Sequence, residues 1–259
     1  MINDEKYTII TPIAKVFKNA NIKSGLETEL LFGDVIQIKD KKKDWVFCKN
    51  FDDQYHGWIN EKVIGSFSKS SHFVSILNTI VFSEPNIKSL PLLNLPYNSK
   101  VNVNFTHDRW SEISLKNNFK IGYIPVNHIS DNTFPKNLII KNSKYFLNVP
   151  YLWGGKSYLG IDCSGLIQLI HQTSGQFFPR NSNEQMEYCK NYKKLDNIQK
   201  GALVFWEGHV ALAIDDKNII HANAFHMNVT IENFIEAKNR ISNSYGDVLN
   251  IYINTKDEI

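Results

Sequence analysis

The chain has 259 residues, of which 42% are hydrophobic and 12% aromatic, so it is long and apolar enough for two or three small domains with cores of their own. Its 29 basic and 26 acidic residues give a net charge of +3 at pH 7. Because the charges are nearly balanced, composition gives no reason to expect a polyanion such as nucleic acid as a partner.

Cysteine content and hydropathy indicate where the protein works. The three cysteines, Cys48, Cys163 and Cys189, are odd in number and have no paired spacing, which is typical of a reducing compartment and provides no disulfide framework. The N-terminal segment lacks the features of a signal peptide, and no apolar run has the length of a membrane span. We therefore expect a cytoplasmic protein that binds no membrane, metal or cofactor, and export stays open as the alternative. The sequence does not determine the oligomeric state, and a monomer is favoured.

The first half of the chain contains one unit used twice. In each copy a segment of alternating apolar and polar residues leads to a Trp-bearing strand and then to Gly-Trp-Ile or Gly-Tyr-Ile. The spacing from Trp45 to Gly57 equals that from Trp110 to Gly122. The segments are too short for helices and are separated by polar turns. Each copy is therefore predicted to form a small, closed or nearly closed all-β barrel.

The predicted barrels occupy residues 1–67 and 68–134, and residues 135–259 form a third domain. Hydrophobic patterning in this domain predicts helices at 138–147, at 163–175 and from Ser182 or Asn183 to about Tyr192, and strands at 202–206, 209–214, 219–223 and 248–253. With the helices packed on one side of an antiparallel sheet, the domain belongs to the α+β class.

The stretch from Tyr151 to Gly175 delivers a cysteine to the start of a helix. A glycine-rich aromatic turn precedes Cys163, and Asp162 is an N-cap type of residue. Unpaired backbone N–H groups and the positive end of the helix dipole favour a thiolate there, so we expect a depressed thiol pKa. Free cysteines are usually buried core residues, but a core position needs neither the Trp-Gly-Gly turn before Cys163 nor the Asp-Cys-Ser-Gly around it.

Two histidines follow on a predicted hairpin. His209 begins one strand and His221 lies in the next, so a nucleophile, a base and an orienting group are available in one domain. The two imidazoles share a face of the sheet if Ala211 lies opposite His221, and a slip of one residue puts them on opposite faces. Taken singly, each histidine is more simply interpreted as structural, and only the combination with Cys163 favours catalysis.

A family resemblance rests on motifs that follow one another in order. They are Pro150-Tyr-Leu-Trp-Gly-Gly-Lys, Asp162-Cys-Ser-Gly-Leu, Pro179-Arg-Asn-Ser-Asn-Glu-Gln185, Gly201-Ala-Leu-Val-Phe-Trp206, His209-Val-Ala and Ile220-His-Ala. Together they resemble the NlpC family of cysteine peptidases, papain-like enzymes that cleave cell-wall peptides. The two barrels resemble the bacterial SH3-like domains that often accompany such peptidases. The implied architecture is α+β, with a papain-like catalytic domain preceded by two small all-β SH3-like barrels.

The resemblance also implies catalytic roles. Cys163 is the nucleophile, His209 the general base and His221 the residue that orients the base, and we expect Cys163 and His209 to form a thiolate–imidazolium pair. Tyr151, together with the backbone N–H of Cys163, is expected to stabilise the oxyanion. Asn148 stands where a glycine often occurs in the family, which affects the local turn rather than the chemistry.

Substrate binding is likewise inferred from the resemblance. Asp162 and Ser164 are placed near the free amino terminus of the substrate. In the cytosolic peptide-recycling members that this three-domain chain resembles, the first barrel helps to bind that amino terminus and blocks longer chains. Tyr55 and Asp34 are the candidates for the phenol and the acidic group that this requires, and both are also interpretable as ordinary turn residues.

The expected function is that of a cysteine peptidase which hydrolyses the γ-D-glutamyl-L-diamino acid bond of peptidoglycan stem peptides with a free N-terminal L-Ala, as in murein peptide recycling. Three alternatives stay open: an endopeptidase acting on intact cell wall, a papain-like acyltransferase or amidase, and a non-catalytic wall-binding protein. The intact set of Cys163, His209 and His221 argues against the last of these. The diamino acid, diaminopimelate or lysine, is not determined by the sequence.

Overall fold

The computed structural model describes residues 5–115, 120–131 and 138–255. The chain divides into two compact units, Met1–Thr133 (unit 1) and Phe134–Ile259 (unit 2). The predicted boundary between residues 134 and 135 lies outside the described residues.

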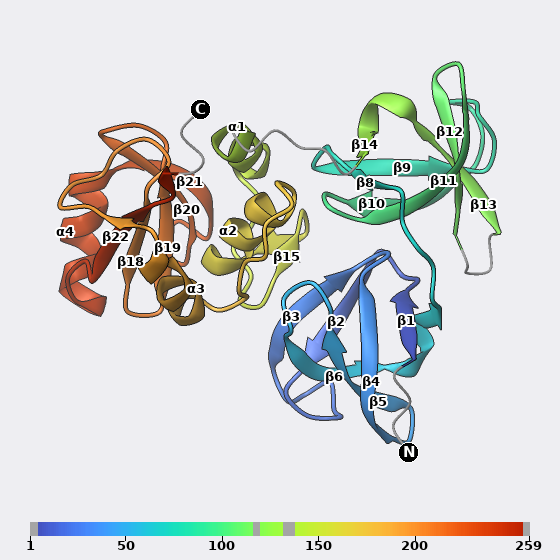
Figure 1. Ribbon diagram of the computed structural model, residues 1–259, viewed down its shortest axis with the longest axis horizontal. Helices are drawn as coiled ribbons and strands as arrows, with labels where there is room; N and C mark the ends of the chain where they lie inside the picture. The colour runs from blue at the N-terminus through green and yellow to red at the C-terminus, as the bar shows by residue number, and fades with distance from the viewer. Residues whose placement is uncertain (1–4, 116–119, 132–137, 256–259) are drawn as a thin grey trace. The chain divides into compact units, whose positions relative to one another are not determined.

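Unit 1 begins with a seven-stranded antiparallel sheet that curls around its own core (Figure 1). Its strands are β1 (Lys6–Ile9), β2 (Ile13–Phe17), β3 (Leu26–Leu31), β4 (Val35–Lys42), β5 (Trp45–Asn50), β6 (His56–Asn60) and β7 (Ile64–Ser66), with the 3₁₀ helix η1 (Glu61–Val63) before β7. The strand order is β3-β2-β6-β5-β4-β1-β7. Ala14 and Val16 of β2 point into the core while Lys15 between them is exposed, which is the alternation that a strand requires.

The second sheet of unit 1 repeats the first. Its strands are β8 (His72–Val74), β9 (Asn78–Phe82), β10 (Pro91–Pro96), β11 (Lys100–His107), β12 (Trp110–Ser114), β13 (Ile121–Pro125) and β14 (Ile129–Asp131), with the 3₁₀ helix η2 (Val126–His128) before β14. Its order, β10-β9-β13-β12-β11-β8-β14, is the order of the first sheet with every number raised by seven. The repeat predicted from the sequence is confirmed.

The aromatic residues of the two copies make matching contacts. Phe17 meets Trp45 edge to face at 5.6 Å between ring centroids, and Phe82 meets Trp110 in the same way at 5.5 Å. Both tryptophans are half-buried. The repeated Trp therefore has one structural function in both barrels, which is to pack against the aromatic residue at the end of the second strand.

Apolar contacts and ion pairs join the two barrels within unit 1. Phe32, which follows β3, packs into the core of the second barrel. Lys100 Nζ forms ion pairs with Asp34 and Asp52, and its backbone N–H donates to the carbonyl of Phe32 at 2.7 Å. Asp34 is 2% exposed, and its other carboxylate oxygen accepts the backbone N–H of Leu31. The carboxylate of Asp34 is thus engaged inside unit 1.

Unit 2 is built on a six-stranded sheet in the order β17-β22-β18-β19-β20-β21. Its strands are β17 (Lys193–Lys194), β18 (Leu203–Trp206), β19 (His209–Ala213), β20 (Asn218–Asn223), β21 (Asn228–Asn233) and β22 (Asn250–Ile253), and β15 (Lys156–Ser157) pairs separately with β16 (Gly160–Ile161). The helices are α1 (Ile139–Ser143), η4 (Lys144–Phe146), α2 (Cys163–Gln172), α3 (Ser182–Tyr188), η5 (Cys189–Asn191) and α4 (Phe234–Tyr245). The helix predicted at 163–175 and the four predicted strands are confirmed with small shifts at their ends.

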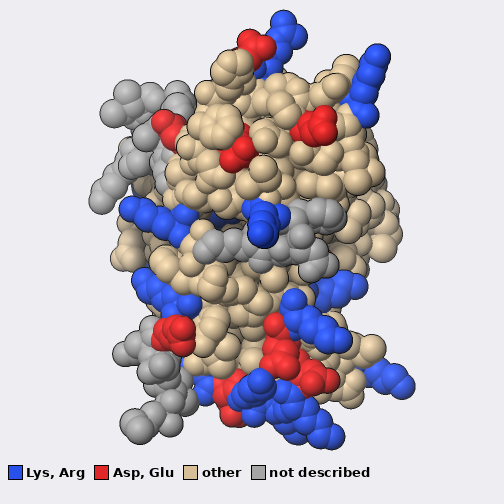
Figure 2. Space-filling model, turned by 90° about the vertical axis from the view of Figure 1, so that its right-hand side faces the viewer, with Lys and Arg blue, Asp and Glu red and all other residues tan. Residues whose placement is uncertain are grey.

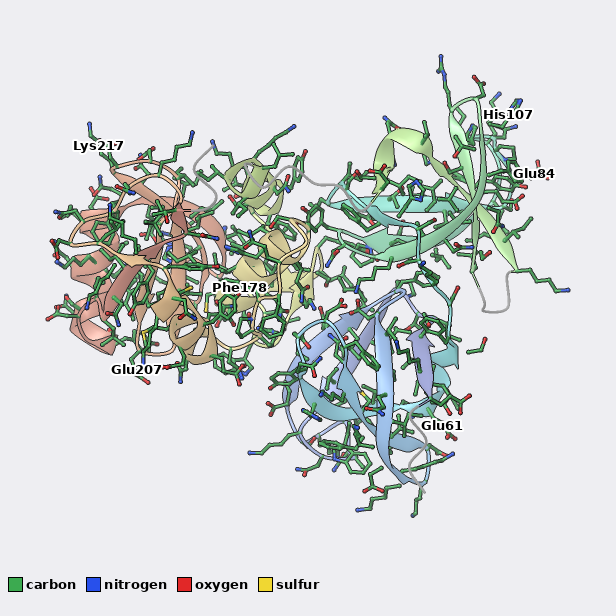
Figure 3. The ribbon with its side chains drawn as sticks, viewed as in Figure 1. Glu61, Glu84, His107, Phe178, Glu207 and Lys217 are labelled. Carbon is green, nitrogen blue, oxygen red and sulfur yellow. The ribbon has the colours of Figure 1, made fainter. Side chains whose placement is uncertain are left out.

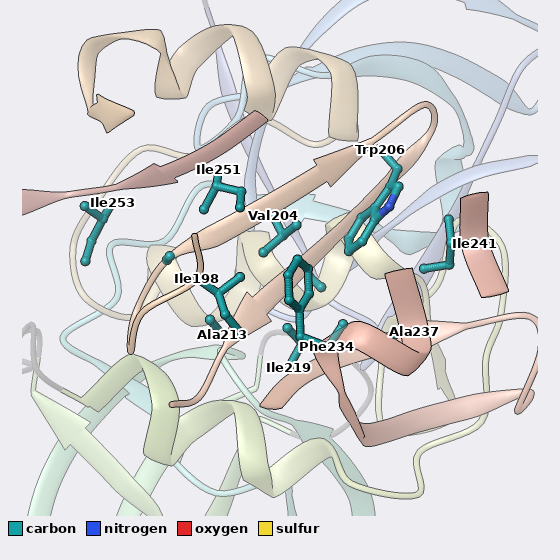
Figure 4. Close-up of a cluster of buried hydrophobic side chains, with 12 residues drawn as sticks. Ile198, Val204, Trp206, Ala213, Ile219, Phe234, Ala237, Ile241, Ile251 and Ile253 are labelled. Carbon is teal, nitrogen blue, oxygen red and sulfur yellow. The ribbon is translucent and has the colours of Figure 1, made fainter. Parts of the chain in front are cut away.

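The helices of unit 2 lie on both faces of the sheet, not on one as predicted. Residues on alternate positions, such as Val204 and Trp206 of β18, form a cluster with Ala237 and Ile241 of α4 (Figure 4). All four residues of β18 are buried, so the opposite face is covered as well, and α2 lies on that side (Figure 1). The prediction was incomplete because β21 and α4 were not recognised in the sequence.

The start of α3 and the packing of Phe178 against α2 complete the description of unit 2. Asn181, rather than Ser182 or Asn183, caps α3 in a capping box with Glu184. Phe178 is buried beside α2, where its ring stacks on His171 at 4.1 Å between centroids (Figure 3).

Charged side chains of both signs are interspersed on the face of the molecule drawn in Figure 2. Within the three described stretches of the chain, no helix combines the length and the apolar character needed to cross a membrane.

Candidate active site

The glycine-rich turn and the start of α2 are built to fit each other. Asp162 caps the helix, because one carboxylate oxygen accepts the backbone N–H of Gly165 at 2.7 Å and the other accepts that of Gly154 at 2.9 Å. A Cβ at Gly165 would lie 2.6 Å from the carbonyl oxygen of Gly155, so only glycine allows this approach. The Trp-Gly-Gly and Asp-Cys-Ser-Gly motifs therefore form one structure that fixes Cys163 in the first turn of the helix.

A buried arginine completes the cap. Arg180 is 2% exposed and binds Asp162 through both ends of its guanidinium, Nη1 to Oδ1 at 2.9 Å and Nη2 to Oδ2 at 2.7 Å. Nη1 also donates to Ser164 Oγ at 2.9 Å. Arg180 lies in a motif quoted above, but the sequence did not indicate its partner. The negative charge of Asp162 is thus balanced inside the protein, and Asp162 and Ser164 are brought together beside Cys163.

The two histidines share a face of the sheet. Leu212 pairs with Ile220 and Ala213 with Ile219, and continuing this register puts Ala211 opposite His221. His209 Nε2 lies 2.8 Å from His221 Nδ1. Of the two alternatives left open by the sequence, the structure has the one in which the imidazoles can act together.

A carboxylate that the sequence analysis missed continues this chain. Glu232 on β21 accepts from His221 Nε2 at 2.6 Å and from Nη2 of Arg240 on α4 at 2.6 and 2.8 Å. Burial alone would raise the pKa of Glu232, but the hydrogen bonds from His221 and Arg240 outweigh it and bring that pKa to about 2. Glu232 is therefore ionised and can only accept.

The ionised carboxylate fixes the protons on both rings. Since Glu232 accepts from His221 Nε2–H, a neutral His221 has its lone pair on Nδ1. His209 must then donate through Nε2–H, which leaves the lone pair of His209 on Nδ1. This is the tautomer that a general base for a thiol needs.

Cys163 lies against the beginning of β19. Its Sγ is 4.0 Å from the carbonyl oxygen of Gly208, and the backbone N–H of Val210 also reaches the thiol. These two residues flank His209, so the start of α2 and the start of β19 converge on the same point. Within unit 2, the fold thus gathers Cys163 and the histidine pair.

The expected depressed thiol pKa is not found. Burial, with a contribution from the charge of Asp162, raises the pKa of Cys163 to about 12, and the backbone N–H groups of Val210 and Ser164 lower it by less. Burial also holds the pKa of His209 well below its ordinary value, assisted by the neighbouring His221. The resting pair is therefore a neutral thiol and a neutral imidazole, and the proton moves when the thiol attacks rather than beforehand.

We accordingly expect alkylation of Cys163 by iodoacetamide to be slow at neutral pH. A thiol whose pKa is raised forms thiolate only as the pH rises toward that pKa, so the rate should increase steadily through the alkaline range. The measurement is peptide mapping by mass spectrometry after alkylation between pH 5 and 10, with buried Cys189 as the internal comparison. A plateau of high reactivity from pH 5 to 8 would instead indicate the thiolate–imidazolium pair.

Tyr151 is held by backbone contacts with β16 and with the residue that precedes β21. It forms a bridge with Ile161, and its backbone N–H donates to the carbonyl of Met227 at 2.9 Å. Burial, followed by the charges of Cys163 and Asp162, raises the pKa of its phenol, so the group stays protonated as a donor. The segment before it turns at Asn148, whose φ of 66° lies in the left-handed region that asparagine tolerates better than most residues.

The two first-barrel candidates lie in unit 1. Tyr55 is half-buried and its hydroxyl donates to Glu27 Oε2 at 3.0 Å, which forms a phenol and carboxylate pair on the first barrel. Asp34 is engaged at the barrel junction as described above. Glu27 was missed because it is far from Tyr55 in the sequence, and only the pairing of strands brings the two together.

Comparison with known proteins gives a consistent result. A model of the NlpC/P60 family matches residues 148–243, and a model of the bacterial dipeptidyl-peptidase Sh3 domain matches residues 16–64. The gamma-D-glutamyl-L-lysine dipeptidyl-peptidase of Bacillus cereus is 30% identical over 242 residues, which span 82% of this chain and 71% of that protein. Dipeptidyl-peptidase 6 of Lysinibacillus sphaericus is 26% identical over 236 residues, which span 83% of this chain and 86% of that protein.

Solved structures support the fold. An NlpC/P60 family protein from Bacillus cereus superimposes with a TM-score of 0.79 at 23% identity, covering 96% of this chain and 99% of that one. An NlpC/P60 endopeptidase from Photobacterium damselae gives a TM-score of 0.63 at 15% identity, covering 97% and 72%.

Proposed function

The chain belongs to the NlpC/P60 family of cysteine peptidases, which act on peptidoglycan, and from this premise we propose that it hydrolyses the γ-D-glutamyl-L-diamino acid bond of stem peptides that carry a free N-terminal L-Ala. Its product would be the dipeptide L-Ala-γ-D-Glu. The reaction would serve the recycling of murein peptides in the cytoplasm.

The observation that carries this proposal is the extent of the match to a dipeptidyl-peptidase. The similarity to the Bacillus cereus enzyme spans 82% of this chain, so it includes barrel residues as well as the peptidase unit. The first barrel separately matches a domain model described by the same activity. An enzyme that removes dipeptides must recognise a free amino terminus at a fixed distance from the cut, and an added domain is a means of doing so.

The proposed mechanism uses groups of unit 2 alone. Nδ1 of His209 takes the proton of the Cys163 thiol as the sulfur attacks the γ-glutamyl carbonyl. The phenol of Tyr151 and the backbone N–H of Cys163 stabilise the oxyanion. The imidazolium then gives its proton to the departing amine as the C–N bond breaks, and water hydrolyses the thioester with His209 again as base. His221 holds His209 in the required tautomer throughout.

The amino terminus of the substrate is proposed to bind at the start of α2 in unit 2. Ser164 and Asp162 would receive it in unit 2, although Arg180 already balances the charge of Asp162. Tyr55 of the first barrel stays a proposed substrate contact, and its hydroxyl donates to Glu27 Oε2 at 3.0 Å. Asp34, the other first-barrel candidate, has partners for both of its carboxylate oxygens within unit 1.

The test is mass spectrometry of tripeptide digests. We would incubate the protein with L-Ala-γ-D-Glu-L-Lys and with the diaminopimelate analogue, each as the free amine and as the N-acetylated peptide. The proposal predicts release of L-Ala-γ-D-Glu from the free amines only. Equal cleavage of the acetylated peptides would mean an endopeptidase of intact wall, and cleavage of none would reject the proposed bond.

A further inference from the structure

A cavity of about 510 Å³ opens beside the catalytic histidine within unit 2. His209 and Tyr151 line one part of it, and Asn223 and Arg240 line another. The described residues that line the cavity do not include Asp162 or Ser164. The cavity therefore adjoins the group that protonates the leaving amine and is separate from the residues assigned to the amino-terminal side of the substrate.

Asn223 lines this cavity and has a buried amide donor. Its side-chain oxygen accepts the backbone N–H of His226 at 2.8 Å, which fixes the orientation of the amide because a backbone N–H can only donate. The amide nitrogen Nδ2 then has no acceptor among the described residues, although Asn223 is buried, with only 6% of its surface exposed. A buried donor without a partner destabilises the fold and is rare in folded proteins. An acceptor atom of a ligand would remove that cost.

Arg240 adds positive charge to the same wall. Its guanidinium lies over the ring of Phe225 at 4.3 Å, and Nη2 binds Glu232. The hydrogen bonds that Arg240 makes to Glu232 use Nη2, and an arginine has five N–H donors in all. Held by Phe225 and Glu232, the guanidinium is preorganised to receive a carboxylate with its remaining donors.

The rest of the cavity fits an amino acid with a long, amine-bearing side chain. Trp153 and Phe225 are 71% and 68% exposed, so the wall offers uncovered apolar rings along which methylene groups can pack. Glu207 lies at the turn between β18 and β19 and projects outward there (Figure 3). A side-chain ammonium that passes the aromatic rings would find this carboxylate.

We propose that this cavity binds the diamino acid released by the cleavage, with its carboxylate on Asn223 Nδ2 and Arg240 and its side chain along the aromatic wall. The inference rests on the proposed function, because it takes the bond that is cut from there. It adds the specificity rule that the leaving residue is bound through a free carboxylate.

The test compares two substrates that differ at one group. L-Ala-γ-D-Glu-L-Lys and the same peptide with a C-terminal carboxamide would be assayed with the unmutated protein and with Asn223→Asp. This substitution keeps the oxygen that accepts the N–H of His226 and replaces the donor by an acceptor, so it favours the carboxamide and repels the carboxylate. We expect the ratio of kcat/KM for carboxylate over carboxamide to fall by roughly 10- to 100-fold, mainly through KM.

Asn239→Asp is the matched control, because it places the same charge on the exposed face of α4 and Asn239 does not line the cavity. It should leave the substrate ratio unchanged. Cleavage of both peptides by the unmutated protein with a ratio that Asn223→Asp does not move would overturn the cavity assignment and leave the proposed function standing. Failure of the unmutated protein to cleave either peptide or the diaminopimelate tripeptide would overturn both, and if only the diaminopimelate tripeptide is cleaved, the same comparison is made with its carboxylate and carboxamide forms.

Discussion

Replacement of Cys163 by alanine is expected to abolish turnover, with a loss of about 10⁶-fold in kcat. The sulfur lies at the start of β19, where the histidine pair fixes a lone pair on His209 for its proton. Because the proposed nucleophile and base act as one unit, His209→Ala should cost nearly as much, and the double variant should lose no more than either single one. Initial rates on the free-amine tripeptide provide the measurement.

Cys189→Ala is the matched control, since Cys189 is fully buried in the same unit and lies outside the proposed site. It should retain its activity per folded molecule. His221→Ala should be milder, at roughly 10⁴-fold, because His209 keeps its place on β19 and loses only the partner that orients it. A loss at His221 as complete as that at Cys163 would mean that base and orienting residue have been exchanged.

The parts of the site that the sequence revealed are those with a local signal. A cysteine after an N-cap residue and a glycine-rich turn can be recognised without knowledge of any distant contact, and the structure places Cys163 at the first position of α2. The relation of His209 to His221 depends on strand register, which a hairpin sequence with a polar turn does not specify. Burial was also invisible, and for that reason the expected pKa of Cys163 was wrong in direction.

The residues that were missed are those whose partners come from unrecognised elements. Glu232 lies on β21 and Arg240 on α4, and neither element was predicted. A signal was present for α4, since Asn233 precedes apolar residues at helical spacing and does cap the helix in the structure. No comparable signal joins Arg180 to Asp162, which are 18 positions apart and meet only when the turn closes over α2.

Replacement of Arg180 by methionine is expected to destabilise the protein by about 3–5 kcal/mol. Methionine fills much of the space but leaves the carboxylate of Asp162 buried, at 7% exposure, without its counter-ion. The carboxylate keeps the N–H groups of Gly154 and Gly165, which cannot balance a full charge in a dry site. Such a loss is a large part of the stability of an ordinary domain, so urea denaturation followed by circular dichroism would detect it directly.

A double-mutant cycle with Asp162→Asn separates loss of the charge pair from loss of packing. In the double variant no buried charge is left unpaired, so it should recover part of the stability that Arg180→Met loses, and the interaction energy of the cycle should be well above that of an exposed pair, about 1 kcal/mol at most. An Arg180→Met protein as stable as the unmutated one would contradict this account. The cap of α2 would then hold by its backbone hydrogen bonds alone, and the buried guanidinium beside Asp162 and Ser164 would have to be explained by substrate binding rather than by the stability of the fold.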